Sequence, residues 1–152
     1  MNREVAHARF RELIEELAAD ARTKRMKQFI QHSDKSTYDH CLDVARHSYF
    51  FAKRLHLQVD EAALVRGAFL HDYYLYDWHT HNDHLHGYHH PEIAVANASR
   101  DFALSPKELD IIRSHMWPLT ITKVPSSKEA AVVCFIDKVC SLRETLRRKK
   151  IR

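Results

Sequence analysis

Several stretches of the sequence carry histidine or aspartate where the apolar pattern around them predicts burial. His71 and Asp72 end the apolar run 64–70, and Asp137 lies inside the apolar run 130–140, with Val133 and Cys140 about one helical turn away. A buried carboxylate without a partner is energetically costly or becomes protonated. Asp137 therefore requires a cation, which is either a basic side chain or a metal ion.

Two further histidines extend this set. His115 follows Ile111 by one turn, so a helix there would place it on or beside a core face. His40 precedes Val44 by one turn, and His47 shares that face two turns later, so spacing alone leaves both open as ligands. Histidine is the commonest metal ligand, and helical bundles build metal sites from side chains that converge from different helices.

The donor types limit which metals such a site would hold. Imidazole and carboxylate ligands favour Zn, Fe, Mn, Co or Ni, because no thiolate is needed. The three cysteines, Cys41, Cys134 and Cys140, have apolar neighbours and no CxxC spacing, so we expect small core residues and free thiols. The sequence leaves open which metal is native and whether one or two ions bind.

Histidine is also the outlier of the composition, with 13 in 152 residues. Six of them fall in one twelve-residue window: His79, His81, His84, His86, His89 and His90. This window offers an alternative, in which the 79–90 loop is a histidine-rich zinc buffer. That alternative predicts many weak sites in place of one or two tight ones.

Helical periodicity dominates the elements that must position these side chains. We expect one all-α domain over residues 1–152, a compact bundle of about six or seven helices. It comprises an N-terminal helix at 4–30, a core at about 36–145 and a basic tail at 143–152. The predicted helix starts are Ser36 with Asp39, Asp60, His90 before Pro91, Ser105 with Glu108, and Ser126 with Glu129.

Composition excludes several classes of protein. No apolar run approaches the roughly 18 residues that span a bilayer, and the charged start lacks a signal peptide, so we expect a cytoplasmic protein. The net charge is +4, and six basic residues lie in the last ten positions. Such a tail could bind nucleic acid nonspecifically. We favour a solvated helix end whose cations suit the helix dipole, and expect no nucleic-acid partner.

The order of the candidate ligands carries a resemblance. His40, then His71 with Asp72, then Asp137 resemble the H…HD…D signature of the HD-domain superfamily of metal-dependent phosphohydrolases. The segments His40–Ala45, Ala68–Asp72 and Phe135–Lys138 are similar to the family's H-x-x-x-V-A helix, its apolar L-H-D helix end and its late apolar-Asp-Lys segment. His90 and His115 look like the extra pair of the H…HD…H…H…D variant, which holds two metals. The resemblance covers roughly residues 36–145.

This resemblance implies a helical fold with a metal site in its core and a function for each anchor. His40, His71, Asp72 and Asp137 would hold one ion. Asp72, the residue assigned to catalysis, would bridge to a second ion held by His90 and His115. Metal-activated water would then hydrolyse a phosphomonoester, phosphodiester or anhydride of a nucleotide-like small molecule. By position alone, Lys138, Arg113, His86 and His89 are the candidates for contacting this substrate or donating a proton.

The sequence also departs from the family pattern. Tyrosines at 73 and 74 follow the His-Asp pair where many relatives continue with Ile-Gly-Lys, and no GYP segment is present. We therefore do not expect cleavage of cyclic dinucleotides. The missing lysine leaves open an alternative, a catalytically inactive metal-binding or regulatory module with the same fold. The substrate and the oligomeric state, a homo-oligomer included, are not set by the sequence.

Overall fold

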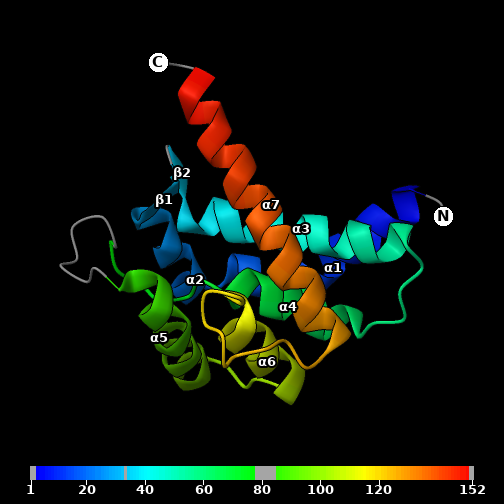
Figure 1. The fold of residues 1–152 in the computed structure, drawn as a ribbon. Coiled ribbons are helices and arrows are strands. Elements are labelled where there is room, and N and C mark those ends of the chain that lie inside the picture. The colour runs from blue at the N-terminus through cyan, green and yellow to red at the C-terminus, as the bar shows by residue number, and fades with distance from the viewer. Residues whose placement is uncertain (1–2, 33, 78–84, 151–152) are drawn as a thin grey trace.

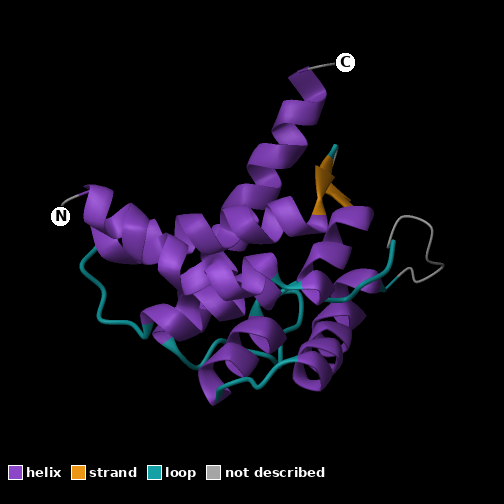
Figure 2. Ribbon diagram, turned by 180° about the vertical axis from the view of Figure 1, so that it is seen from behind, coloured by secondary structure: helices purple, strands orange, loops and turns teal. Residues whose placement is uncertain are grey.

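The computed structural model describes residues 3–32, 34–77 and 85–150. In this part of the chain, seven α-helices and a short 3-10 helix (Arg25–Gln28) accompany a hairpin of two short strands, β1 (Ile30–His32) and β2 (Lys35–Ser36) (Figures 1 and 2). The α-helices are α1 (Arg3–Ala19), α2 (Ala21–Lys24), α3 (Thr37–Arg54), α4 (Glu61–Leu70), α5 (His86–Asp101), α6 (Pro106–Ser114) and α7 (Lys128–Lys150). The all-α prediction is confirmed. Among the described helices, none combines the length and apolar character that crossing a bilayer requires.

The central helix is α4, which packs between α3 and α6 while α1 covers it from another side. Its sequence is apolar on nearly every face, and Leu64, Val65 and Ala68 are fully buried, as expected for a helix inside a core. The long helix α7 crosses α3 and α6, and its C-terminal end projects beyond the body of the molecule (Figure 1). This arrangement brings one end of α4 close to α3, α6 and α7.

Three helix starts lie where the sequence predicts them. The Ser36 side chain accepts a hydrogen bond from the Asp39 N–H at 3.1 Å, and the Asp60 carboxylate accepts one from the Ala63 N–H at 3.0 Å. At α6 the Ser105 side chain and Glu108 form a complete capping box. These caps satisfy backbone donors that the first turn of a helix leaves unpaired, and so they fix where each helix begins.

The N-terminal region differs from the single helix predicted at 4–30. Helix α1 ends at Ala19, and the Asp20 carboxylate accepts a hydrogen bond from the Arg22 N–H at 2.7 Å, so that a new short helix begins. The hairpin that follows was not predicted from the sequence. Its strands have two and three residues, which is too short to show the alternation of apolar and polar side chains that identifies a strand.

Helix α5 begins at His86, four residues before the predicted start at His90. Pro91 consequently lies inside the helix, where its missing N–H cannot bond to the carbonyl of Gly87. The earlier start places His90 in the second turn of α5 and not ahead of the helix.

The start of α7 also differs by one residue from the predicted pair of Ser126 and Glu129. The Ser127 side chain accepts a hydrogen bond from the Ala130 N–H at 3.1 Å. The Glu129 carboxylate turns away and accepts a bond from the Asp60 N–H at 2.6 Å, at the start of α4. A tertiary contact therefore uses the carboxylate that local pattern assigns to a capping box.

Gly67 sets how closely α4 approaches α6. A Cβ at this position would lie 2.5 Å from Ile111 Cδ1 and 3.1 Å from Ile111 Cβ. We expect Gly67→Ala to lower the free energy of unfolding by about 1–2 kcal/mol, because overpacking against a stiff β-branched side chain outweighs the gain in helix propensity. Urea denaturation measures this, with the exposed substitution Ala62→Ser as control. Equal stability of the Gly67 variant would show that the two helices can separate without cost.

Candidate metal centre

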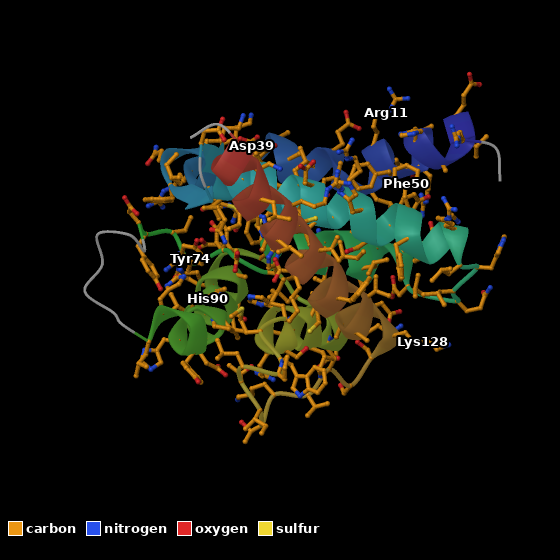
Figure 3. The ribbon with its side chains drawn as sticks, turned by 45° about the horizontal axis from the view of Figure 1, so that its top comes forward. Arg11, Asp39, Phe50, Tyr74, His90 and Lys128 are labelled. Atoms are coloured by element: carbon orange, nitrogen blue, oxygen red, sulfur yellow. The ribbon has the colours of Figure 1, made fainter. Side chains whose placement is uncertain are left out.

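Six predicted ligand residues converge at one end of α4. His40 lies in the first turn of α3, His71 and Asp72 directly follow α4, and His90 lies in α5. His115 follows the last turn of α6, and Asp137 lies in α7. All six side chains are buried, His40 and His71 completely. His90 also lies beside the ring of Tyr74, which belongs to the segment after α4 (Figure 3).

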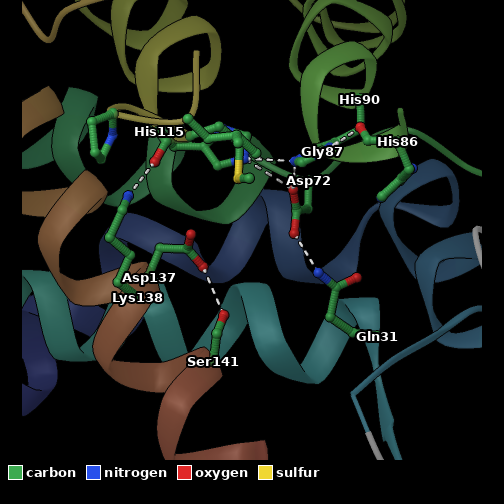
Figure 4. A pocket seen from close by; sticks show the side chains of 12 residues that line it. Gln31, Asp72, His86, Gly87, His90, His115, Asp137, Lys138 and Ser141 are labelled. Atoms are coloured by element: carbon green, nitrogen blue, oxygen red, sulfur yellow. Dashed lines mark hydrogen bonds and ion pairs between the residues drawn. The ribbon is translucent and has the colours of Figure 1, made fainter. Parts of the chain in front are cut away.

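The Asp72 carboxylate lies between two groups of histidines, of which Figure 4 shows His90 and His115. Its Oδ1 atom is 3.2 Å from His90 Nε2 and 3.3 Å from His115 Nε2. Its Oδ2 atom is 3.4 Å from His71 Nε2 and 3.9 Å from His40 Nε2. One carboxylate therefore faces two separate sets of nitrogen atoms.

Asp137 completes one of these sets. Its Oδ1 atom lies 3.0 Å from His40 Nε2 and 3.5 Å from His71 Nε2, and Ser141 Oγ donates to the same oxygen at 3.4 Å. The side chain of this buried aspartate thus points at two histidines and not at an arginine or lysine. The cation that the sequence requires for Asp137 is an imidazolium in the metal-free protein, and a metal ion can replace it.

In His71, His90 and His115, the ring nitrogen that points away from the cluster lies close to a backbone carbonyl oxygen. His71 Nδ1 lies 2.7 Å from the Ala68 carbonyl oxygen, and His115 Nδ1 lies 2.8 Å from the Ile112 carbonyl oxygen. His90 Nδ1 lies 2.9 Å from the carbonyl oxygen of His86. A carbonyl can only accept, so each of these Nδ1 atoms carries a proton, and each Nε2 points to the interior, where it can offer its lone pair to a metal ion. Metal-binding histidines typically donate their second N–H in this way.

Two observations show that these residues fit a metal ion. First, His71 Nε2 and Asp72 Oδ1 are buried and have no hydrogen-bond partner among the described residues. Second, His90 Nε2 and His115 Nε2 lie 2.8 Å apart, although the proton of each ring is committed to a carbonyl on its other side. Two facing lone pairs repel each other unless a cation lies beside both. The nitrogen and oxygen donors match those of divalent transition metals.

Asp72 and Asp137 are ionised and can therefore bind a cation. Burial disfavours their charge, yet His71 holds the pKa of Asp72, and His40 with His71 that of Asp137, well below the ordinary value. Burial likewise opposes charge on His40, but Asp137 and Glu144 raise its pKa to about 10. Burial lowers the pKa of His115, which keeps that ring neutral at pH 7. A metal ion binding beside His40 therefore has to displace a proton.

Gln31, in β1, orients the bridging carboxylate. Its side-chain N–H donates to Asp72 Oδ2 at 2.6 Å, while its amide oxygen accepts hydrogen bonds from the Tyr74 hydroxyl and from Thr37 Oγ1. This leaves Asp72 Oδ1 directed at His90 and His115. The unpredicted hairpin thus supports the cluster from the side of the molecule opposite α6.

A cavity of about 620 Å³ opens onto the cluster (Figure 4). Asp72, His90, His115 and Asp137 form part of its wall. Lys138 and Ser141 from α7 lie beside them, and an apolar part of the wall is formed by Gly87, Met116, Pro118 and Leu119. A small molecule in this cavity can therefore reach the buried ligand residues directly.

The other predicted candidates have varied locations. His47 does not join the cluster, and its Nδ1 lies 2.7 Å from the Asp43 carbonyl oxygen, which leaves His40 as the α3 histidine at this site. Lys138 and His86 line the cavity, whereas Arg113 and His89 are exposed and are not part of its wall. Of the histidine-rich window, His79, His81 and His84 lie outside the described residues, as do the side chains at 147–152 in the basic tail.

Comparison with known protein families shows to which family the chain belongs. The family model described as HD domain matches residues 37–142, from the first residue of α3 into α7. The chain belongs to the HD domain family. With its buried histidine and aspartate cluster, it is an HD-domain phosphohydrolase, and the cluster suits divalent metal ions. No curated protein and no solved structure matched this HD-domain chain.

Three residues around the cluster were missed from the sequence, namely Gln31, Lys35 and Glu144. Each contacts a ligand residue or supports one that does. All three lie outside the HD domain match, so the family pattern gives no signal for them. The one available signal was helical phase, because Glu144 follows Asp137 by seven residues and so shares its face of α7.

Proposed function

We propose that this HD-domain phosphohydrolase cleaves a phosphate ester or anhydride of a nucleotide-sized small molecule. The observation that carries the proposal is the position of the cavity, whose wall includes Asp72, Asp137, His90 and His115. A phosphoryl group at the inner end of this cavity would lie against the buried ligand residues, while the rest of the molecule occupied the outer part.

We assign the ligands to two positions that share Asp72. His40, His71, Asp72 and Asp137 form one, and Asp72, His90 and His115 form the other, as the two faces of the Asp72 carboxylate support. These residues would hold divalent transition metal ions drawn from Fe, Mn, Zn, Co and Ni, which would supply acidified water and positive charge beside the phosphate. Gln31 holds the shared carboxylate in the orientation that both positions need.

Lys138 is the candidate for binding the phosphate. Its Nζ atom donates to the carbonyl oxygens of His115 at 2.9 Å and Cys134 at 3.1 Å, which holds the ammonium group at the cavity wall. Its third contact is with Cys134 Sγ at 3.2 Å. Sulfur is a weak acceptor, so a phosphate oxygen can take its place without disturbing the two stronger bonds.

The remaining wall of the cavity suits the uncharged part of a substrate. Met116, Pro118 and Leu119 offer an apolar surface on which a base or similar ring can lie, and they keep bulk water from that side of the site. His86 lines the same cavity and its ring stacks on that of His90, with centroids 4.6 Å apart. It is therefore the candidate proton donor to the leaving group.

The cysteines support the proposal that this enzyme works in the cytoplasm. Cys41, Cys134 and Cys140 are all buried free thiols, as expected for a protein folded in a reducing compartment.

Phosphate release tests the proposed activity directly. We expect purified protein, stripped by chelator, to release phosphate from at least one member of a panel of nucleoside mono-, di- and triphosphates and simple phosphomonoesters only after Mn, Fe, Co, Ni or Zn is restored. The chelated protein and free metal in buffer are the controls. Tight metal binding without turnover on any substrate would contradict the proposal and favour the inactive regulatory module.

A further inference from the structure

Glu144 is a buried carboxylate on α7 that the HD-domain ligand set does not include. Its Oε2 atom lies 3.0 Å from His40 Nδ1, and its Oε1 atom lies 3.2 Å from the same nitrogen. On the other side of the ring, His40 Nε2 faces Asp137 at 3.0 Å. Asp137 and Glu144 lie two helical turns apart on one face of α7. Together they contact both ring nitrogens of His40.

The position of His40 in its helix explains why it needs a side-chain acceptor. His71 and His115 lie at the C-terminal ends of α4 and α6, where backbone carbonyls are left without intrahelical partners. Their Nδ1 protons use these carbonyls. His40 lies instead in the first turn of α3, where the unpaired backbone groups are N–H donors. The acceptor for its Nδ1 proton comes from another element, and Glu144 supplies it.

Lys35 fixes the orientation of Glu144. Its Nζ atom lies 3.0 Å from Glu144 Oε1 and also binds the Asp43 carboxylate on α3. Lys35 belongs to β2, so the hairpin that supports Asp72 through Gln31 also supports His40 through Glu144. The family match begins at residue 37 and ends at residue 142, and therefore includes neither Lys35 nor Glu144.

We infer that Glu144, oriented by Lys35, is a positioning residue for the metal centre. It accepts the proton of His40 Nδ1 and so turns Nε2 toward Asp137, where a metal ion would displace the Nε2 proton. A carboxylate hydrogen-bonded to the outer nitrogen of a ligand histidine fixes the ring and makes the inner nitrogen a stronger donor. This inference rests on the proposed role of His40 as a metal ligand, and it adds the residues that prepare that ligand.

Titration calorimetry of metal-free protein with Mn²⁺ or Co²⁺ tests this role without relying on turnover. We expect Glu144→Ala to raise the dissociation constant of the ion at His40 by about 10- to 100-fold, the range typical for loss of such a partner. Glu144→Gln keeps an acceptor but loses the charge, so we expect a smaller rise. Lys35→Met should also weaken binding, because Glu144 then loses its restraint. The d–d spectrum of the Co²⁺ form should change in the same order.

The matched control is Asp43→Asn, which removes a charge from the same lysine but leaves the acceptor of His40 in place. We expect it to bind metal as the wild type does. Thermal unfolding of each metal-free variant shows whether it folds, and the near-isosteric Gln variant serves if the Ala variant does not. Wild-type affinity in folded Glu144 variants, or equal loss in Asp43→Asn, would overturn the inference. Absence of metal binding in the wild type would overturn the proposed function instead.

Discussion

Replacing Asp72 with asparagine is expected to reduce kcat/KM for phosphate release by roughly a thousandfold, or about 4 kcal/mol of transition-state stabilisation. The two oxygens of this carboxylate face different sets of histidines, with Oδ1 near His90 and His115 and Oδ2 near His71. An amide offers only one oxygen and carries no charge, so both sides lose the negative charge and one side also loses its oxygen ligand. Steady-state phosphate release and elemental analysis of the same preparation measure both consequences.

The control for this experiment is Asp39→Asn. Asp39 is an exposed carboxylate near the start of α3, and its neutralisation changes the charge of the protein equally without touching the cluster. We expect Asp39→Asn to keep its activity and metal content. If Asp72→Asn retained more than a few per cent of wild-type activity while folded, the shared position of this carboxylate would have no part in the reaction.

The second large effect concerns the number of ions. We expect His115→Gln to lower the metal content of fully loaded protein from two ions to one, and to reduce kcat by about two orders of magnitude. The reason is that His90 and His115 are the two nitrogen donors on the Oδ1 side of Asp72, with their Nε2 atoms 2.8 Å apart. Loss of either leaves too few donors there. Elemental analysis after removal of loosely bound metal gives the stoichiometry.

His47→Gln is the matched variant, since it removes a histidine whose ring nitrogen bonds to a backbone carbonyl away from the cluster. It should keep two ions and near-normal turnover. Two ions in the His115 variant would show that His115 is not needed to hold the second ion. One ion in the wild type would show that the site is a single metal position, with His115 as a supporting residue.

The positions of the candidate ligand histidines could be predicted because local sequence controls where they lie. Ser36 and Asp60 cap α3 and α4 as expected, and these caps set the helical phase that turns His40 inward and leaves His71 and Asp72 at a helix end. Helical spacing to Ile111 supplied His115, and family order supplied His90 and paired it with His115. Although α5 starts earlier than predicted, His90 still joins the cluster, because it lies one turn after His86 in the helix.

The supporting residues could not be predicted in the same way. Gln31 meets Asp72 across 41 positions of sequence, and Glu144 meets His40 across 104. Nothing in the local pattern around a glutamine or glutamate says which distant polar group it will face. The segment around Glu144 is strongly basic and favoured a solvated tail. Helical phase places Glu144 on the same face as Asp137, but its contact with His40 becomes apparent only when α7 is packed against α3.

The distribution of the cluster over the chain has a consequence for biosynthesis. The candidate ligands come from α3, the end of α4, α5, the end of α6 and α7. Glu144, which positions His40, lies later still in α7. During translation, an emerging chain that stops short of α7 contains the four candidate histidines but neither Asp137 nor Glu144. The full set of candidate ligands therefore comes together only once α7 has packed against α3, so we expect a nascent chain that lacks α7 to bind metal more weakly than the folded protein.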